Sequence, residues 1–355
     1  MDIPTLHQIL EIAFNKGVSD IHFEVDNPPI FRVRGHLIRA KLKDLRPEDT
    51  EFIARLVMEH QDRPLPDDLR EIDTSYSLPD VGRFRVSIFR QKGVIGIVMR
   101  VIPHYIGTFE ELNLPPVLGE FVQIPNGLII VTGPTGNGKS TTLASMIRYI
   151  NENFNYNIIT IEDPIEFLFK SDKSCIVQRE LGIDTDSFDK ALRAAMRMDP
   201  DVIMVGEMRD LETIEGCIKA AETGHLVMTS LHTNNAASTI NRIIGYFPPD
   251  MQDNVRHRLA ESLVATISIR LVRDKTGERI LPALEIMYNT STIKACIHEG
   301  KLDELEEHIE KGSDSYMMQS LDQHLIQLCK QDIISLDEAK RVSRSSDLER
   351  KLIYF

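Results

Sequence analysis

Residues 133–140 read Gly-Pro-Thr-Gly-Asn-Gly-Lys-Ser and match the pattern G-x-x-x-x-G-K-[ST]. A strand-like apolar run, 127–131, leads into this stretch, and a helical run, 141–147, leads out of it. Glycine lets consecutive backbone N–H groups turn inward without a side-chain clash, and the following helix points its positive dipole end at the same spot. Strand, loop and helix together predict a phosphate-binding loop, and this context disfavours the alternative of an ordinary glycine-rich turn.

The loop predicts a nucleotide site with a divalent cation. Lys139 can reach the β- and γ-phosphates of a nucleotide, and the hydroxyl of Ser140 can ligate Mg²⁺. We therefore expect ATP and Mg²⁺ as cofactors. The residues of this stretch that we expect to contact the nucleotide are Gly133, Pro134, Thr135, Gly136, Asn137, Gly138, Lys139, Ser140 and Thr141.

Composition limits the class of protein. The chain has 355 residues, enough for two or three domains with real cores, and its formal net charge is −13. An acidic surface repels phosphate backbones, so we expect no nucleic-acid partner. The four cysteines stand far apart without a C-x-x-C pair, which argues against a disulfide framework or a thiolate zinc site.

The sequence also indicates where the protein resides. No apolar run approaches the roughly 20 residues of a membrane span. The first residues lack the basic and apolar regions of a signal peptide. The widely spaced cysteines suit a reducing compartment. We therefore expect a cytoplasmic protein.

The N-terminal part of the chain has the pattern of a small α+β domain. Apolar residues with helical spacing predict two helices, and alternation of apolar and polar residues predicts strands. Gly35 and His36 are expected to form a hairpin tip. The predicted helices are 4–16 and about 47–60, and the predicted strands are 19–25, 30–34, 72–78 and further strands within 83–101.

A proline-containing segment, 102–125, is predicted to be a linker that serves as a hinge. After it, strands alternate with helices, which is typical of a parallel sheet. From about residue 250 the chain is expected to be mostly helical, with a charged, solvated face at 301–311. The predicted elements of the alternating part are strands at 128–132, 157–162, 175–178, 202–206 and 225–230 and a helix at 187–198.

Acidic residues follow two of these strands. Glu162 and Asp163 end the strand at 157–162, and Glu207 follows the strand at 202–206. Because the carboxyl ends of parallel strands meet at one ligand crevice, these carboxylates should face the phosphates. Hydrolysis needs a carboxylate that orients water and others that hold the metal, so we expect Glu162 and Glu207 in both roles. The alternative is a solvated carboxylate at a strand end.

Histidines and arginines provide further candidates. His225 and His232 flank a predicted strand, and an imidazole there could donate to a γ-phosphate. Arg83 and Arg85 share one face of a strand and, with Arg90 and Arg100, could form an anion site. The alternatives are structural histidines and a solvated strand face.

With these residues in view, the chain resembles the type IV pilus retraction ATPases of the secretion-ATPase superfamily. The resemblance runs from about Gly17 to the C-terminus and includes a Walker B region that reads LRAAMRMDPDVIMVGEMRD. The matching stretches are the N-terminal opening 18–22, Walker A 133–142, the acidic Asp box 159–167, Walker B 192–210, the His box 223–233 and a C-terminal stretch 318–323.

The resemblance implies an α/β protein that works as a hexameric ring, with ATP between a PAS-like domain and a RecA-like core. It implies that Glu207 is the Walker B glutamate, that Glu162 lies in the Asp box, and that His225 and His232 lie in the His box. Arg85 and Arg100 are the best matches to arginines that complete the site. The implied parts are a PAS-like domain at 1–101, the linker at 102–125, the core at 126–288 and a helical region at 289–355.

The implied work is pilus retraction, which drives twitching motility. The motor would act through an inner-membrane platform protein, at the cytoplasmic face of that membrane.

Two stretches depart from the family pattern. Asn137 stands where the family usually has Ser, and residues 292–297 read Thr-Ile-Lys-Ala-Cys-Ile in place of A-I-R-N-L-[IV]. The alternatives are an accessory retraction paralogue, a pilus-assembly or type II secretion ATPase, a DNA-processing ATPase and a nucleotide switch without hydrolysis.

Overall fold

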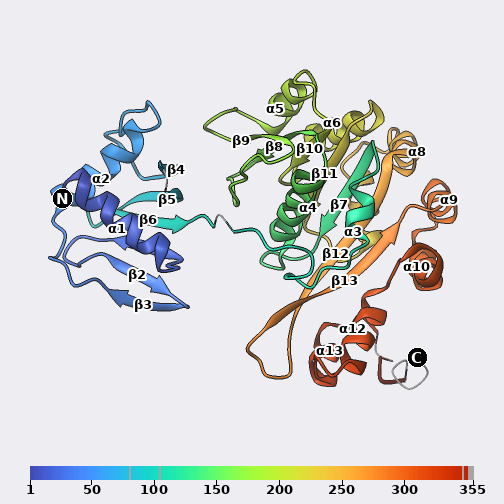
Figure 1. Cartoon of the computed structure of the whole chain (residues 1–355). Helices are drawn as coiled ribbons and strands as arrows, with labels where there is room; N and C mark the ends of the chain where they lie inside the picture. Colours follow the sequence, from blue (N-terminus) through green and yellow to red (C-terminus); the bar gives the residue numbers. More distant parts are fainter. Residues whose placement is uncertain (80, 104, 346–347, 351–355) are drawn as a thin grey trace. The chain divides into compact units, whose positions relative to one another are not determined.

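The computed structural model describes residues 1–79, 81–103, 105–345 and 348–350 (Figure 1). Two compact units make up the chain. Unit 1 is Met1–Tyr105 with Glu166–Leu168, and unit 2 is Ile106–Ile165 with Phe169–Phe355. We describe each unit by itself.

Unit 1 is a six-stranded sheet in the order β3-β2-β1-β6-β5-β4, in which all neighbours are antiparallel. Helices α1 (Ile3–Asn15) and α2 (Pro47–Glu59) bury Leu6 and Ile53 in the same core as Phe23 and Phe84 of the sheet. The strands are β1 (Asp20–Phe23), β2 (Ile30–Val33), β3 (His36–Arg39), β4 (Glu71–Leu78), β5 (Gly82–Gln91) and β6 (Val94–Val101).

Local sequence explains most of unit 1. The side chain of Asp2 accepts a hydrogen bond from the Thr5 N–H and caps α1, and Gly17 follows the helix with a φ of 65°. Alternation on β5 places Phe84 and Val86 inside and arginines outside. The strand β3 was not predicted, because its four residues are all exposed and show no alternation.

Unit 2 contains a seven-stranded sheet in the order β13-β12-β7-β11-β10-β8-β9, parallel except for β13. All six residues of β7 are buried, as expected for a strand with both faces covered. The strands are β7 (Gly127–Thr132), β8 (Asn157–Glu162), β9 (Cys175–Glu180), β10 (Val202–Val205), β11 (Leu226–Leu231), β12 (Leu263–Arg273) and β13 (Ile280–Tyr288).

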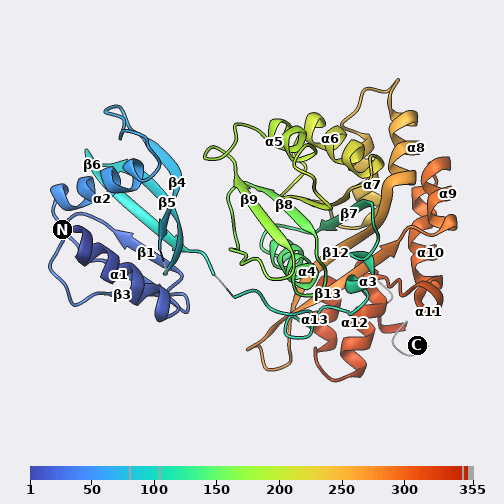
Figure 2. The ribbon, with the colours of Figure 1, turned by 45° about the horizontal axis from the view of Figure 1, so that its top comes forward.

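Helices cover both faces of this sheet (Figure 1, Figure 2). Leu128 and Ile130 face a core shared with α5, α6, α7 and α8, whereas Ile129 and Val131 face a core shared with α3 and α4. These helices are α3 (Leu118–Phe121), α4 (Lys139–Asn153), α5 (Phe188–Ala195), α6 (Leu211–Glu222), α7 (Ala236–Ile244) and α8 (Gln252–Ser262). The predicted α/β fold with a parallel sheet is confirmed.

The expectation of a mostly helical chain after residue 250 was wrong for β12 and β13. Residues Leu263–Val272 form a largely buried run without helical spacing, and β12 gains its place by pairing with β7, far away in sequence. The C-terminal helices then pack on this hairpin and on the sheet (Figure 2). They are α9 (Ser291–Glu299), the 3₁₀ turn η1 (Leu302–Glu304), α10 (Leu305–Lys311), α11 (Ser313–Tyr316), α12 (Leu321–Lys330) and α13 (Leu336–Val342).

Two predicted surface segments contribute to the core. In the segment expected to be a linker, Leu114, Val117 and Leu118 are buried in unit 2. The apolar residues that lie between and after its prolines pack on α4. In the charged stretch 301–311, Leu305 and Ile309 are buried, so only part of that helix is a solvated face. Among the described helices, none combines the length and the apolar composition that crossing a membrane requires.

Buried His324 on α12 gives a prediction about stability. Its Nδ1 accepts a hydrogen bond from the Leu284 N–H at 2.9 Å, and burial lowers its pKa from 6.5 to about 4. The folded state therefore holds this imidazole neutral, while the unfolded chain binds a proton below pH 6.5. The contribution of the neutral His324 to the free energy of unfolding is fully present above pH 6.5. It is lost as the pH falls toward 4, at up to about 1.4 kcal/mol per pH unit.

We expect His324→Asn to flatten this dependence, because the amide oxygen can still accept the Leu284 hydrogen bond but does not titrate. The measurement is the free energy of unfolding in urea at several pH values between 7 and 4.5 for both proteins. Equal slopes in the two proteins would show that His324 is protonated in the folded state as readily as in the unfolded one.

Candidate active site

The phosphate loop connects β7 to α4 and depends on glycine. Gly133 has a φ of 147°, and a Cβ atom there would lie 2.5 Å from the carbonyl oxygen of Ile269 on β12. Gly136 and Gly138 have φ angles of 78° and 83°, also in the region that favours glycine. The backbone therefore has the strand, loop and helix geometry that the motif predicts.

Lys139, the first residue of α4, folds back over this loop. Its Nζ donates to the carbonyl oxygens of Gly133 and Pro134 at 3.0 and 3.1 Å and lies 3.2 Å from Nδ1 of His232. The side chain is buried, with 8% of the residue exposed. These contacts hold the ammonium group at the loop where phosphate oxygens are expected.

Glu207 follows β10 and contacts His232, the same imidazole that Lys139 contacts. One carboxylate oxygen lies 3.2 Å from Nε2 of His232, and the other accepts from Nε of Arg209 at 2.6 Å. Partial burial opposes ionisation, but the hydrogen bonds from Arg209 and His232 outweigh it and hold the pKa of Glu207 below its usual value. An ionised carboxylate is therefore connected through one imidazole to Lys139, and it can accept a hydrogen bond from water.

Glu162 ends β8, the neighbour of β10 in the sheet. It is buried and accepts hydrogen bonds from Oγ1 of Thr160 at 2.6 Å and from Nε2 of Gln178 at 3.1 Å. Because β7, β8, β10 and β11 are parallel, their carboxyl ends bring Glu162, Glu207, His232 and the phosphate loop to one edge.

The donor set at this edge suits a hard divalent cation. Ser140 offers a hydroxyl from the first turn of α4, and Glu162 and Glu207 offer carboxylates. Mg²⁺ prefers oxygen ligands and binds through one or two carboxylates together with phosphate oxygens. These residues therefore fit Mg²⁺ in chemical type.

The structure does not bring His225 to the phosphate loop of the same chain. His225 precedes β11, and the register pairs Leu226 with Gly127, at the end of β7 opposite to the loop. Its Nδ1 lies 2.9 Å from the carbonyl oxygen of Ala220 and 3.3 Å from Oγ1 of Thr223. Within one chain these contacts are those of a structural histidine that joins α6 to β11.

The predicted arginines lie in unit 1, on the face of the sheet opposite its core. Arg85 and Arg100 are directly paired across β5 and β6, and Asp20 is paired with Arg100 on the next strand. Arg100 donates to Asp20 at 2.8 Å, and Arg85 lies 4.0 Å from Asp73. Arg83 donates to the hydroxyls of Ser75 and Ser77 at 2.8 and 3.4 Å. These residues form a basic row on one sheet face.

Some contacts at the site were missed by sequence reasoning. Arg209 bridges Glu207 and Asp163, with a distance of 2.7 Å to Asp163. The sequence shows Arg209 two residues after Glu207, but it does not show the contact with Asp163, which follows β8. Asn137, which departs from the family pattern, accepts from the Leu271 N–H at 2.9 Å and so ties the loop to β12.

A buried carboxylate behind the loop was also missed. Glu285 on β13 accepts hydrogen bonds from the Ala236 N–H at 2.8 Å and from Oγ of Ser268 at 3.1 Å, and Ser268 in turn accepts from Thr132 just before the loop. Nη1 of Arg344 donates to Glu285 at 2.6 Å. The network joins the phosphate loop, the start of α7 and the C-terminal segment.

A phosphate loop after an inner, parallel strand of the sheet, with carboxylates at the ends of two further parallel strands, defines a P-loop ATPase. Residues 2–344 match the family described as Type II/IV secretion system protein. The chain belongs to this family.

Relatives and solved structures agree with that assignment. The chain is 42% identical to the type IV pilus retraction ATPase PilT of Pseudomonas aeruginosa, over 95% of this chain and 97% of the relative. It is 38% identical to the type IV pilus ATPase PilU of the same organism, over 98% and 90%. A crystal structure of the pilus retraction motor PilT with bound ADP is similar with a TM-score of 0.89 and 44% identity, over 97% of this chain and 99% of that one.

Glu207→Gln should retain ATP binding and lower kcat by about 100-fold or more, because an amide keeps the shape but does not orient and polarise water as a carboxylate does. Phosphate release and binding of a fluorescent ATP analogue are measured on the same preparation. Glu212→Gln on α6, an exposed glutamate, serves as the control. If Glu207→Gln turns over while Glu162→Gln does not, the roles of the two carboxylates are reversed.

Proposed function

We propose that this protein is a hexameric ATPase motor that powers pilus retraction, and with it twitching motility. The observation that carries the proposal is the likeness to PilT along nearly the whole chain, which includes the phosphate loop and both acidic strand ends. The docking partner is an inner-membrane platform protein, and the motor works at the cytoplasmic face of that membrane. Nucleic acid is not a partner, in keeping with the net charge of −13.

The reaction is ATP + H₂O → ADP + phosphate, and each residue of the site has a separate role in it. The loop N–H groups and Lys139 bind the β- and γ-phosphates, which orients the terminal phosphate for in-line attack. Glu207 orients the attacking water, and His232, between Glu207 and Lys139, is placed to respond to the terminal phosphate. Ser140, Glu162 and Glu207 would hold Mg²⁺, which supplies charge neutralisation when bound.

The arginines of unit 1 take a catalytic role in this proposal. The side chains of Arg85 and Arg100 are 43% and 66% exposed, and a guanidinium fits phosphate oxygens with two parallel hydrogen bonds. They would stabilise the negative charge that develops on the transferred phosphate, as arginine fingers do in other P-loop enzymes.

An accessory retraction motor is the second candidate. The observation that favours it is the stretch 292–297, which departs from the A-I-R-N-L-[IV] pattern of the retraction branch. The likeness to PilU is also almost as high as the likeness to PilT, at 38% against 42% identity. The two candidates share the same chemistry and differ in whether the cell retracts pili without this protein.

Arg85→Ala and Arg100→Ala should each lower kcat by at least about 100-fold with little change in stability. Asp20 retains Arg32 at 3.7 Å when Arg100 is removed, so the sheet should stay folded. Arg39→Ala on exposed β3 of the same unit is the matched control. Normal phosphate release in both variants, with oligomers of normal size, would assign this row to a solvated face.

Deleting the gene tests the direction of work. Loss of a retraction motor should leave cells with as many pili as before or more, and without twitching movement. Wild-type protein should restore movement, and Lys139→Ala, which removes charge at the phosphates, should not. Cells without pili would identify an assembly motor instead, and normal movement with normal piliation would favour the accessory role.

A further inference from the structure

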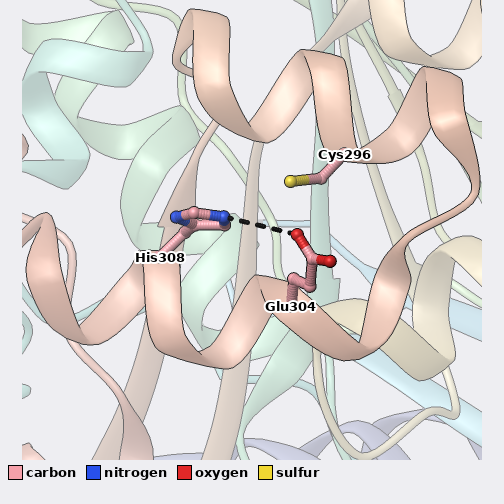
Figure 3. Close-up of side chains that lie close together, drawn as sticks. All are labelled: Cys296, Glu304 and His308. Atoms are coloured by element: carbon pink, nitrogen blue, oxygen red, sulfur yellow. Dashed lines mark ion pairs between the residues drawn. The ribbon is translucent and has the colours of Figure 1, made fainter.

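Three side chains of types that commonly ligate metals converge where α9 meets α10 (Figure 3). Cys296 comes from α9, Glu304 ends η1 and precedes α10, and His308 lies one turn further along α10. One ligand atom from each residue, a sulfur, an oxygen and a nitrogen, lies within 4.8 Å of the other two. We propose that Cys296, Glu304 and His308 bind a zinc ion.

The chemical types of the three donors favour zinc. Thiolate sulfur and imidazole nitrogen are its usual ligands, and a carboxylate oxygen is a common third, whereas Mg²⁺ and Ca²⁺ prefer oxygen alone. Zinc–ligand bonds of about 2.0–2.3 Å place neighbouring donors roughly 3–4 Å apart. Nε2 of His308 already lies 4.0 Å from a carboxylate oxygen of Glu304, so small side-chain rotations complete the arrangement. Water can supply a fourth ligand.

The backbone around the site is fixed by packing. Ile297 on α9 and Leu305 and Ile309 on α10 are buried in the core of unit 2, which sets the separation of the two helices. The turn between them is closed by a hydrogen bond from the Lys301 N–H to the Cys296 carbonyl oxygen at 2.9 Å. The ligands are therefore presented by ordered elements, which lowers the entropic cost of binding.

The surrounding charge favours a cation. Residues 299–311 contain six acidic residues and two lysines. Burial, and then the charges of Glu304 and Glu299, raise the pKa of the Cys296 thiol, so the thiolate is not favoured by the protein alone. Zinc would form the Zn–S bond as the thiol releases its proton to water.

The absence of a C-x-x-C pair led us to expect no thiolate zinc site, but the proposed ligands have the spacing C-x₇-E-x₃-H.

Cys296 lies within the stretch 292–297, in which the sequence departs from the family pattern. A zinc ion there would clamp α9 to α10 on the core of unit 2, apart from the phosphate loop. The proposal does not depend on the proposed function, since a P-loop ATPase of any kind could carry it.

The test is zinc binding to the purified full chain, stripped of metal and kept in excess Mg²⁺, which occupies oxygen sites but does not compete for a thiolate. We expect one tightly bound zinc per chain by titration calorimetry and elemental analysis. Cys296→Ser and His308→Gln should each weaken binding by more than about tenfold. Cys175→Ser, which removes an exposed cysteine on β9, should leave it unchanged.

A nearby histidine pair provides the strongest competing explanation. Nδ1 of His257 on α8 lies 2.5 Å from Nδ1 of His298 on α9. His257→Ala should therefore also leave zinc binding unchanged. Full affinity in Cys296→Ser, or loss of affinity in His257→Ala alone, would overturn the proposal.

Cobalt substitution keeps the test valid if Cys296→Ser fails to fold. Co²⁺ bound to wild-type protein should show a thiolate-to-metal charge-transfer band in the near ultraviolet that excess Zn²⁺ removes. Cobalt bound without that band would show that no thiolate is a ligand and would likewise overturn the proposal.

Discussion

Parallel pairing of β7 with β11 and β12 is the constraint on which the site depends. It places the carboxyl end of β7 at the same edge as the ends of β8, β10 and β11. The close approach of Gly133 to the Ile269 carbonyl on β12 leaves no room for a side chain. Lys139, His232 and Glu207 can then form one chain of contacts. This is so although Lys139 and His232 are 93 residues apart in sequence and His232 and Glu207 are 25 residues apart.

The carboxylate of Glu285 connects this edge to the rest of unit 2. A carboxylate with only 2% of the residue exposed is costly unless its oxygens accept hydrogen bonds, and here an N–H, a hydroxyl and a guanidinium supply them. The Arg344 guanidinium also donates to the carbonyl oxygen of Asn234, two residues after His232. The C-terminal segment thus supports the loop that carries the histidine at the site.

Among the described residues, the sheet of unit 1 has helices on one face only, unlike the sheet of unit 2, which has helices on both faces. One face packs on two helices, and the other presents arginines in a row whose repulsion Asp20 and Asp73 reduce. Such a face is costly to maintain without negative partners, because like charges on adjacent strands repel one another. The two carboxylates make the row stable, and the exposed guanidinium groups keep their capacity to bind phosphate.

The sequence alone determined the phosphate loop, the parallel strands, the acidic strand ends and most of unit 1, because these features depend on local pattern. Glycine indicates left-handed backbone, apolar runs indicate buried strands, and alternation of apolar and polar residues indicates half-buried strands. It did not determine β12 and β13, the Arg209 bridge, the Glu285 network, the position of His225 away from the loop or the meeting of Cys296 with His308. Each of these is decided by which strands and helices become neighbours. That choice depends on burial of the whole core, so only the tertiary structure could decide it.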